Sequence, residues 1–395
     1  MSSRARLTAF FAALAALVVV ASVLAIVLRP AASGAAAPAA FDISAGLDDC
    51  GRGWRSADGA AATVPGGDQT FSVTNTTVGG IEVYLQAVDS KRVYLDLESL
   101  GAGAHATVRA SLGAGRYRFV CLPADADPAR GPTVIVGKAP PGSALTPGIV
   151  PVTRNDLIPV TKAYTAWVAG RLPTLQRQVA AVAADAEEGD LPAAKRDWLT
   201  AHTTYETLGG AYDAFGDLGE ELDGLPRHGL TGFHLLESQL WHGAPALDVA
   251  ASAHALVALV GKLQAQFADA QLDPGDVALR AHEIVEDAIQ DGLTGATDAG
   301  SGTELAGIDA NLTGAAAALA PLHDVLAGRY DRLAETQQAL TQAQALVESF
   351  RAADGTWTPL SELDLNARER VDAALSHAAE LLAPVAAICD PRRES

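Results

Sequence analysis

Three segments of the sequence each carry a histidine followed, about one helical turn later, by a glutamate. The pairs are His202 and Glu206, His234 and Glu237, and His282 and Glu286. Residues three or four positions apart lie on one face of a helix, so each pair presents an imidazole and a carboxylate in one direction. These groups are ligands for iron, zinc, manganese and copper. Facing helices of a bundle can converge them on one point, where a cation offsets the cost of burying several carboxylates.

The pairs differ in their surroundings. The stretch "GFHLLESQLW" sets His234 and Glu237 beside an apolar stripe of Phe233, Leu236 and Leu240, so this pair is the strongest candidate. The alternative for any single pair is a surface ion pair. Three pairs on three expected helices of one domain favour a shared metal site.

The third segment, "RAHEIVEDAIQDGLTG", is the weakest of the three. Arg280, Glu283 and Asp287 make it generally polar, and solvated charge can explain its composition. Glu283 is a further candidate ligand in this segment, beside His282 and Glu286.

The composition limits the possible partners. The chain has 395 residues, a formal net charge of −19 and a pI near 4.8. A nucleic-acid binder needs a basic face, so we do not expect this protein to bind nucleic acid. An acidic protein attracts cations, which is compatible with metal handling.

The first 30 residues read as a signal or a membrane anchor. Arg4 and Arg6 precede an uncharged run from Leu7 to Leu28. Such a run is long enough to cross a hydrocarbon core of about 30 Å, and longer than the apolar region of about 7–15 residues in most signal peptides. We favour an uncleaved anchor, and a cleaved signal is the alternative. Under either interpretation the remainder is extracytoplasmic.

The sequence has three cysteines, and an extracytoplasmic location would place them in an oxidising compartment. Cys50 and Cys121 bracket the first globular segment, and Cys121 alternates with Tyr117 and Phe119 toward the inside of a strand. We predict a Cys50–Cys121 disulfide, which would stabilise the fold by roughly 4 kcal/mol, and a free Cys389.

Residues 41–137 have a hydrophobic period of two. Stretches such as "QTFSVTN", "IEVYLQAV", "RVYLDLESL", "HATVRASL", "GRYRFVCL" and "TVIV" are separated by turn residues, which predicts a β-sandwich. A blue-copper centre needs two histidines, a cysteine and usually a methionine. This segment offers one histidine, His105, with Cys121 as the candidate thiolate, and the sole methionine is Met1. We therefore expect no copper electron carrier.

Residues 138–156 are rich in proline and glycine and read as a linker, after which the period becomes 3.6. Short connections between the helical stretches predict an antiparallel bundle over 157–390. Helices are expected near 157–186, 191–212, 229–242, 246–270, 275–291, 303–328, 329–351 and 366–388.

The helical segments resemble the imelysin-like (M75 peptidase) family, whose hallmark is a G-x-H-x-x-E motif. It stands here as Gly232, His234 and Glu237 in "GFHLLE". "WLTAHTTYETLGGAYDAFGD", "AHEIVEDAIQDGLTG" and "FRAADGTWTPLSEL" are similar to other characteristic segments of the family. With the preceding β-domain, residues 41 to 390 resemble the long form of the EfeO family. The implied fold is a cupredoxin-like β-sandwich followed by an imelysin-like antiparallel helical bundle.

The resemblance implies an extracytoplasmic iron-binding protein that works with an EfeU-type iron permease and an EfeB-type haem peroxidase. Its implied metal ligands are His234 and Glu237, with Glu206 from the "YE" segment and, less directly, Glu283 or Glu286. The cargo would be Fe²⁺ or Fe³⁺, although Cu²⁺ or Zn²⁺ can bind such ligands more tightly in vitro. A second metal site in the β-domain is doubtful because its ligand set is incomplete.

Two other functions stay open at this point. In a metal-dependent peptidase or hydrolase, Glu237 would act as a base near a metal-bound water. Neither H-E-x-x-H nor G-x-S-x-G occurs in the sequence, however, so no catalytic motif supports an enzyme. The other possibility is an envelope adhesion or sensor module with a structural metal. The sequence favours iron binding and transport.

Overall fold

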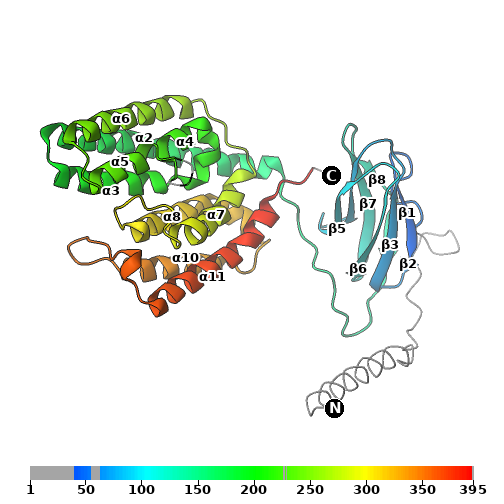
Figure 1. Ribbon diagram of the computed structural model, residues 1–395. Coiled ribbons are helices and arrows are strands. Elements are labelled where there is room, and N and C mark those ends of the chain that lie inside the picture. Colours follow the sequence, from blue (N-terminus) through cyan, green and yellow to red (C-terminus); the bar gives the residue numbers. More distant parts are fainter. Residues whose placement is uncertain (1–39, 55–62, 226, 228, 394–395) are drawn as a thin grey trace, which may run out of the picture. The chain divides into compact units, whose positions relative to one another are not determined.

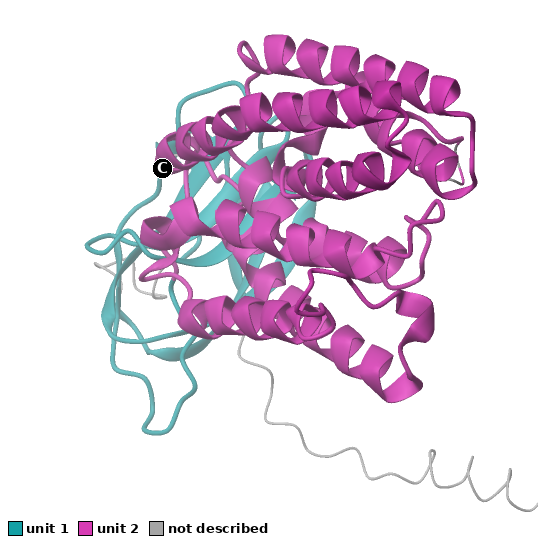
Figure 2. Cartoon of the chain, turned by 90° about the vertical axis from the view of Figure 1, so that its left-hand side faces the viewer, with its two compact units in different colours: residues 1–148 teal, residues 149–395 magenta. Residues whose placement is uncertain are grey.

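The computed structural model describes residues 40–54, 63–225, 227 and 229–393 (Figure 1). The chain forms two compact units, which divide between Gly148 and Ile149 (Figure 2). This boundary lies within the predicted linker. The apolar run expected to be a signal or an anchor, residues 7–28, lies outside the described residues.

The first unit contains β-strands in two mixed sheets. The strands are β1 (Phe41–Ala45), β2 (Thr63–Val64), β3 (Gly67–Asn75), β4 (Ile81–Ala87), β5 (Val93–Leu100), β6 (His105–Leu112), β7 (Gly115–Pro123), β8 (Ala129–Arg130) and β9 (Val134–Val136). One sheet has the order β1-β3-β6, and the other has the order β2-β9-β7-β4-β5, with β8 paired to β7. The β1–β3 and β2–β9 pairs are parallel, and the other strand pairs are antiparallel.

The two sheets share one hydrophobic core. Phe71 of β3 and Phe119 of β7 meet edge to face at 5.3 Å, and the buried Trp54 packs against both rings. Buried and more exposed positions alternate along most of β3, as its period of two predicts. The six predicted strands are confirmed, whereas β1, β2 and β8 were not predicted.

The disulfide prediction is also confirmed. Cys50 and Cys121 are bonded, with a Cα–Cα distance of 5.9 Å, and Cys389 is free and buried. Cys121 is therefore not available as a thiolate ligand. His105, the other residue considered for a copper site, is exposed on β6.

The second unit is helical. Its α-helices are α2 (Arg154–Glu188), α3 (Leu191–Glu206), α4 (Asp217–Asp223), α5 (Gly232–Trp241), α6 (Ala246–Phe267), α7 (Asp276–Asp287), α8 (Glu304–Leu319), α9 (His323–Leu326), α10 (Leu333–Glu348) and α11 (Leu365–Cys389). Short 3₁₀ turns are η1 (Gly209–Phe215), η3 (Ala320–Leu322) and η4 (Leu360–Glu362), and η2 (Ala288–Gly292) is a π-helical turn that follows α7.

Two predicted helices near the site need correction. The helix expected over 191–212 ends at Glu206, and a separate 3₁₀ turn follows it. The reason is local, because Gly209 and Gly210 weaken the helix. The helix expected over 229–242 begins only at Gly232, and the short α4 that precedes it was not predicted.

The helical unit encloses a hydrophobic core to which α2 contributes along most of its length. Helix α2 packs against α3 and α6, and α5 packs against α3, α4 and α6. Within the described residues, three helical stretches are long and apolar enough to cross a membrane: Ala246–Phe267, Glu304–Leu326 and Leu365–Cys389. Each also contributes residues to this core.

Candidate metal centre

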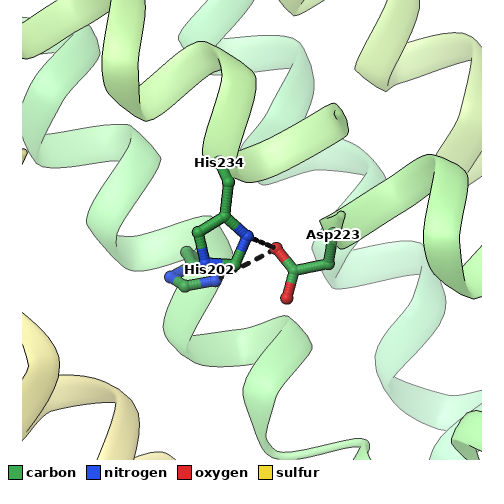
Figure 3. A group of neighbouring side chains, drawn as sticks. All are labelled: His202, Asp223 and His234. Carbon is green, nitrogen blue, oxygen red and sulfur yellow. Dashed lines mark ion pairs between the residues drawn. The ribbon is translucent and has the colours of Figure 1, made fainter. Parts of the chain in front are cut away.

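Two histidines and an aspartate from three successive helices converge inside the helical unit (Figure 3). They are His202 of α3, Asp223 at the end of α4 and His234 of α5. One candidate ligand atom from each lies within 4.8 Å of the other two. Asp223 Oδ1 is 2.8 Å from His234 Nδ1 and 3.4 Å from His202 Nε2. Two imidazole nitrogens and one carboxylate oxygen therefore surround one point.

A glycine allows α4 and α5 to meet closely enough to form this group. Gly232, the first residue of α5, has φ +46°, and a Cβ atom there would lie 1.8 Å from the carbonyl oxygen of Leu222. Any other residue at this position would push α5 away from the end of α4. The glycine of the G-x-H-x-x-E motif thus brings His234 to Asp223.

The connection between α4 and α5 is also held by the side chain of Thr231. Its hydroxyl accepts a hydrogen bond of 2.8 Å from the Gly224 N–H and donates one to the carbonyl oxygen of Glu220. Asp223 lies between these two anchor points in the chain. The hydroxyl therefore restrains the backbone on both sides of this carboxylate.

Trp198 positions His202 relative to α5. The indole Nε1–H donates a 3.0 Å hydrogen bond to the carbonyl oxygen of Phe233. The indole ring stacks on the His202 imidazole, with a centroid distance of 4.8 Å and an interplanar angle of 25°. The Phe233 ring contacts the same imidazole, with a centroid distance of 5.2 Å. Packing on these rings restricts the orientation of His202.

The charges within the group are strongly coupled. Burial lowers the pKa of His202, but Asp223 and Glu206 raise it well above its ordinary value. Burial likewise lowers the pKa of His234, and Asp223 raises it, with a net upward shift. Burial raises the pKa of Asp223, but the two imidazoles lower it below its ordinary range. A divalent cation at this point would take the place of imidazole protons.

Glu206 lies at the edge of the group. Its Oε1 atom is 3.3 Å from His202 Nε2, and its Oε2 atom accepts a 2.6 Å hydrogen bond from Asn311 Nδ2 of α8. The i,i+4 relation predicted between His202 and Glu206 is therefore present as a contact. Asn311, which the sequence did not single out, fixes the direction of the Glu206 carboxylate.

Glu237 is almost fully buried, with 1% of its surface exposed, but it does not belong to the three-residue group. Its Oε1 atom accepts hydrogen bonds from the backbone N–H groups of Ala299, at 3.1 Å, and Ser301, at 3.0 Å. Its Oε2 atom has no hydrogen-bond partner among the described groups. Burial raises the pKa of this carboxyl. Glu237 thus joins α5 to the loop that precedes α8.

The third predicted pair lies elsewhere. His282 Nε2 is 3.4 Å from Glu286 Oε1, and Glu283 forms a 2.9 Å ion pair with Arg280. None of His282, Glu283 and Glu286 is among the described residues that line the cavity around the metal group, whereas Arg280 and Ile284 of the same helix are. Positions two residues apart point to nearly opposite sides of a helix, so the turn of α7 directs the pair away.

The metal group opens into a cavity of about 490 Å³. Trp198, Tyr205 and Ile308 form part of its apolar wall. Glu206, Asp223 and Glu237 also line it, together with six other carboxylates: Asp213, Glu220, Asp287, Asp291, Asp298 and Glu304. Of the candidate ligands named from the sequence, His202, Glu206, His234 and Glu237 therefore face one space.

Asp223 is the residue that the sequence analysis missed. It ends the stretch "DLGEELD", which is flanked by Gly216 and Gly224 and was assigned to no helix. An aspartate before a glycine reads as a turn residue, which hides a ligand role. Its closeness to "GFHLLE" in sequence was the available signal.

Comparison with known proteins identifies no family for the chain. No model of a known protein family matches it, and a search of curated proteins finds no match either.

Proposed function

We propose that this protein is an extracytoplasmic iron-binding protein that captures iron in its helical unit and delivers it to a membrane permease. The observation that carries the proposal is the buried group of His202, Asp223 and His234, whose ligand atoms lie within 4.8 Å of one another. The imelysin-like sequence features supply the pathway, with an EfeU-type permease and an EfeB-type haem peroxidase as partners.

The ligand set supports iron as a cargo. Two histidines and one carboxylate that leave further positions open are typical of non-haem Fe²⁺ sites. Open positions also allow a metal ion to be exchanged, whereas closed thiolate sites are typical of structural metal. In the metal group, nitrogen and oxygen atoms supply these ligands.

An oxidising compartment is supported by the disulfide between Cys50 and Cys121. Disulfides persist mainly in secreted and envelope proteins. The uncharged run from Leu7 to Leu28 agrees with this location and would hold or export the chain.

No catalytic motif supports hydrolysis, and one oxygen of Glu237 is held by the loop before α8. As the base of a hydrolase, Glu237 would have to accept a proton from a metal-bound water. One of its oxygens is engaged by the N–H groups of Ala299 and Ser301, which fixes the carboxylate in place. This contact suits a structural link to the loop before α8.

Titration of the full chain with Fe²⁺ under anaerobic conditions tests the metal site. We expect His202→Ala and His234→Ala each to weaken binding by more than about 100-fold, because loss of a ligand exceeds the about 10–100-fold effect of altering its outer partners. His282→Ala serves as a matched control and should leave the affinity unchanged. Circular dichroism of each variant confirms that the helices remain. Equal affinity in all variants would exclude this group as the metal site.

Delivery is tested separately by growth under iron restriction. Deleting the gene should slow growth, and the wild-type protein should restore it. A His202→Ala/His234→Ala variant, produced at the same level, should fail to do so. Rescue by both proteins would show that the group is not the working site for transport.

A further inference from the structure

The cavity offers more room than a bare metal ion requires. Its volume is about 490 Å³, whereas one ordered water needs roughly 10–15 Å³ of such space. The metal group occupies only part of the lining, since residues of η1, α7 and α8 and the loop before α8 contribute as well. The cavity can therefore receive a metal ion together with small molecules bound to it.

Two buried carboxylate oxygens in this lining need hydrogen-bond donors. Glu237 Oε2 and Glu304 Oε2 are both inaccessible and have no hydrogen-bond partner among the described groups. Glu237 as a whole is 1% exposed, so bulk solvent does not satisfy this oxygen. A buried acceptor without a donor costs free energy. Cargo that brings O–H or N–H groups into the cavity would remove this cost.

The charge of the lining determines whether the cavity attracts a positively or a negatively charged cargo. Asp213, Glu220 and Asp298 add to the carboxylates near the metal group, whereas Asp287 is paired with Arg280. Arg280 is the one arginine among the described lining residues, and its guanidinium is already engaged by Glu283 and by the carbonyl oxygen of Gly209. A cation is therefore attracted into the cavity, whereas an anion is repelled.

We infer that the cavity takes its metal as a hydrated divalent cation that keeps part of its water shell, and rejects complexes with anionic carboxylate chelators. The inference rests on the proposed function, because it assumes that His202, Asp223 and His234 hold the metal. The three protein ligands leave about three positions of an octahedral ion to water. Glu237 Oε2 and Glu304 Oε2 belong to residues of the same lining and can accept hydrogen bonds from such waters. An anionic chelator would instead bring further acceptors to these oxygens.

The waters can be counted with Mn²⁺ as the probe. Mn²⁺ is divalent, accepts the same ligand types and is paramagnetic, so the relaxation of solvent protons reports the water molecules bound to it. We expect about three exchangeable waters on Mn²⁺ held by the full chain. A complex without bound water would overturn the inference, even if Mn²⁺ binds tightly.

Rejection of anionic chelators is tested by equilibrium dialysis with labelled metal and labelled citrate. We expect the protein to retain the metal according to the free-ion concentration and to retain no citrate. Retention of citrate in proportion to the metal would contradict the inference. Failure of His202→Ala/His234→Ala to reduce metal retention would instead contradict the proposed function, so the two failures are distinct.

A variant of the lining provides the matched comparison. Glu304→Gln removes a negative charge and replaces one acceptor oxygen with an amide, so the affinity for Mn²⁺ should fall about tenfold. Glu380→Gln makes the same change at an exposed position of α11 and should leave the affinity unchanged. Tighter binding of metal citrate by the wild-type protein than by the Glu304→Gln variant would overturn the inference. Circular dichroism verifies that both variants fold.

Discussion

The indole ring of Trp198 lies in stacking contact with the imidazole of His202, at a centroid distance of 4.8 Å. The same indole donates its N–H to the backbone of α5, which carries His234. Trp198 therefore connects two of the helices that supply the metal group. It also places a fluorescent ring directly against a ligand.

Metal binding should be visible in tryptophan fluorescence. We expect Fe²⁺ or Cu²⁺ to quench part of the emission, because ions with partly filled d shells quench an excited indole at this range. The loss is partial, since the chain has five tryptophans. Zn²⁺ has a filled d shell and no redox chemistry, so it should bind with little quenching. His234→Ala should lose the response to Fe²⁺ at the same metal concentration, and an unchanged response would place the bound ion elsewhere.

The close approach of Gly232 to Leu222 predicts a large effect of Gly232→Ala. An added methyl group would collide with the Leu222 carbonyl, and the residue would keep an unfavourable positive φ. We expect a loss of unfolding free energy of about 1–3 kcal/mol, with weaker metal binding because His234 moves away from Asp223.

Gly261→Ala is the control for this prediction. Gly261 lies within α6, and its added Cβ would make only an ordinary contact with Gln176. This change should preserve stability or raise it by up to about 1 kcal/mol. Thermal unfolding and calorimetric metal titration measure both variants. Equal behaviour of the two would refute the role assigned to Gly232.

The thiol of Cys389 should be unreactive in the folded protein. Burial raises its pKa to about 12, from an ordinary value near 9. The thiolate is the reactive form, so at pH 8 to 9 the native thiol stays protonated and shielded. Iodoacetamide should label Cys389 only after denaturation, and mass spectrometry of the peptides checks this. Rapid labelling of the native chain at pH 8 would contradict the buried position.

Because the folded pKa is the higher one, burial of the neutral thiol favours the folded state below about pH 9. This contribution is lost progressively as the pH rises from about 9 toward about 12.

The secondary structure of the β unit could be predicted from local patterns. Phe71 and Val73 alternate with polar neighbours on β3, and a period of two has one structural meaning. The two-residue strands β2 and β8 are too short for any period to show. Their pairing depends on neighbours that are distant in sequence.

In the helical unit, the limits of prediction coincide with the site. Helix α4 has only seven residues between two glycines, fewer than are needed to show a period of 3.6. It therefore read as a turn, and Asp223 was missed with it. Gly216, with φ +55°, allows the sharp change of direction before α4, and Gly224 leaves room for the Thr231 hydroxyl after it.

The sequence by itself determined the chemistry of the site: imidazoles and carboxylates at helical spacing on several helices. A spacing of three or four residues sets only the face of one helix on which a pair lies. Which faces meet depends on how each helix is rotated and packed. The tertiary structure decided that His202 and His234 converge on Asp223, that Glu237 binds a loop, and that His282 and Glu286 point elsewhere. These choices arise from contacts between separate segments, such as Gly232 on Leu222 and Trp198 on Phe233, which no local period encodes.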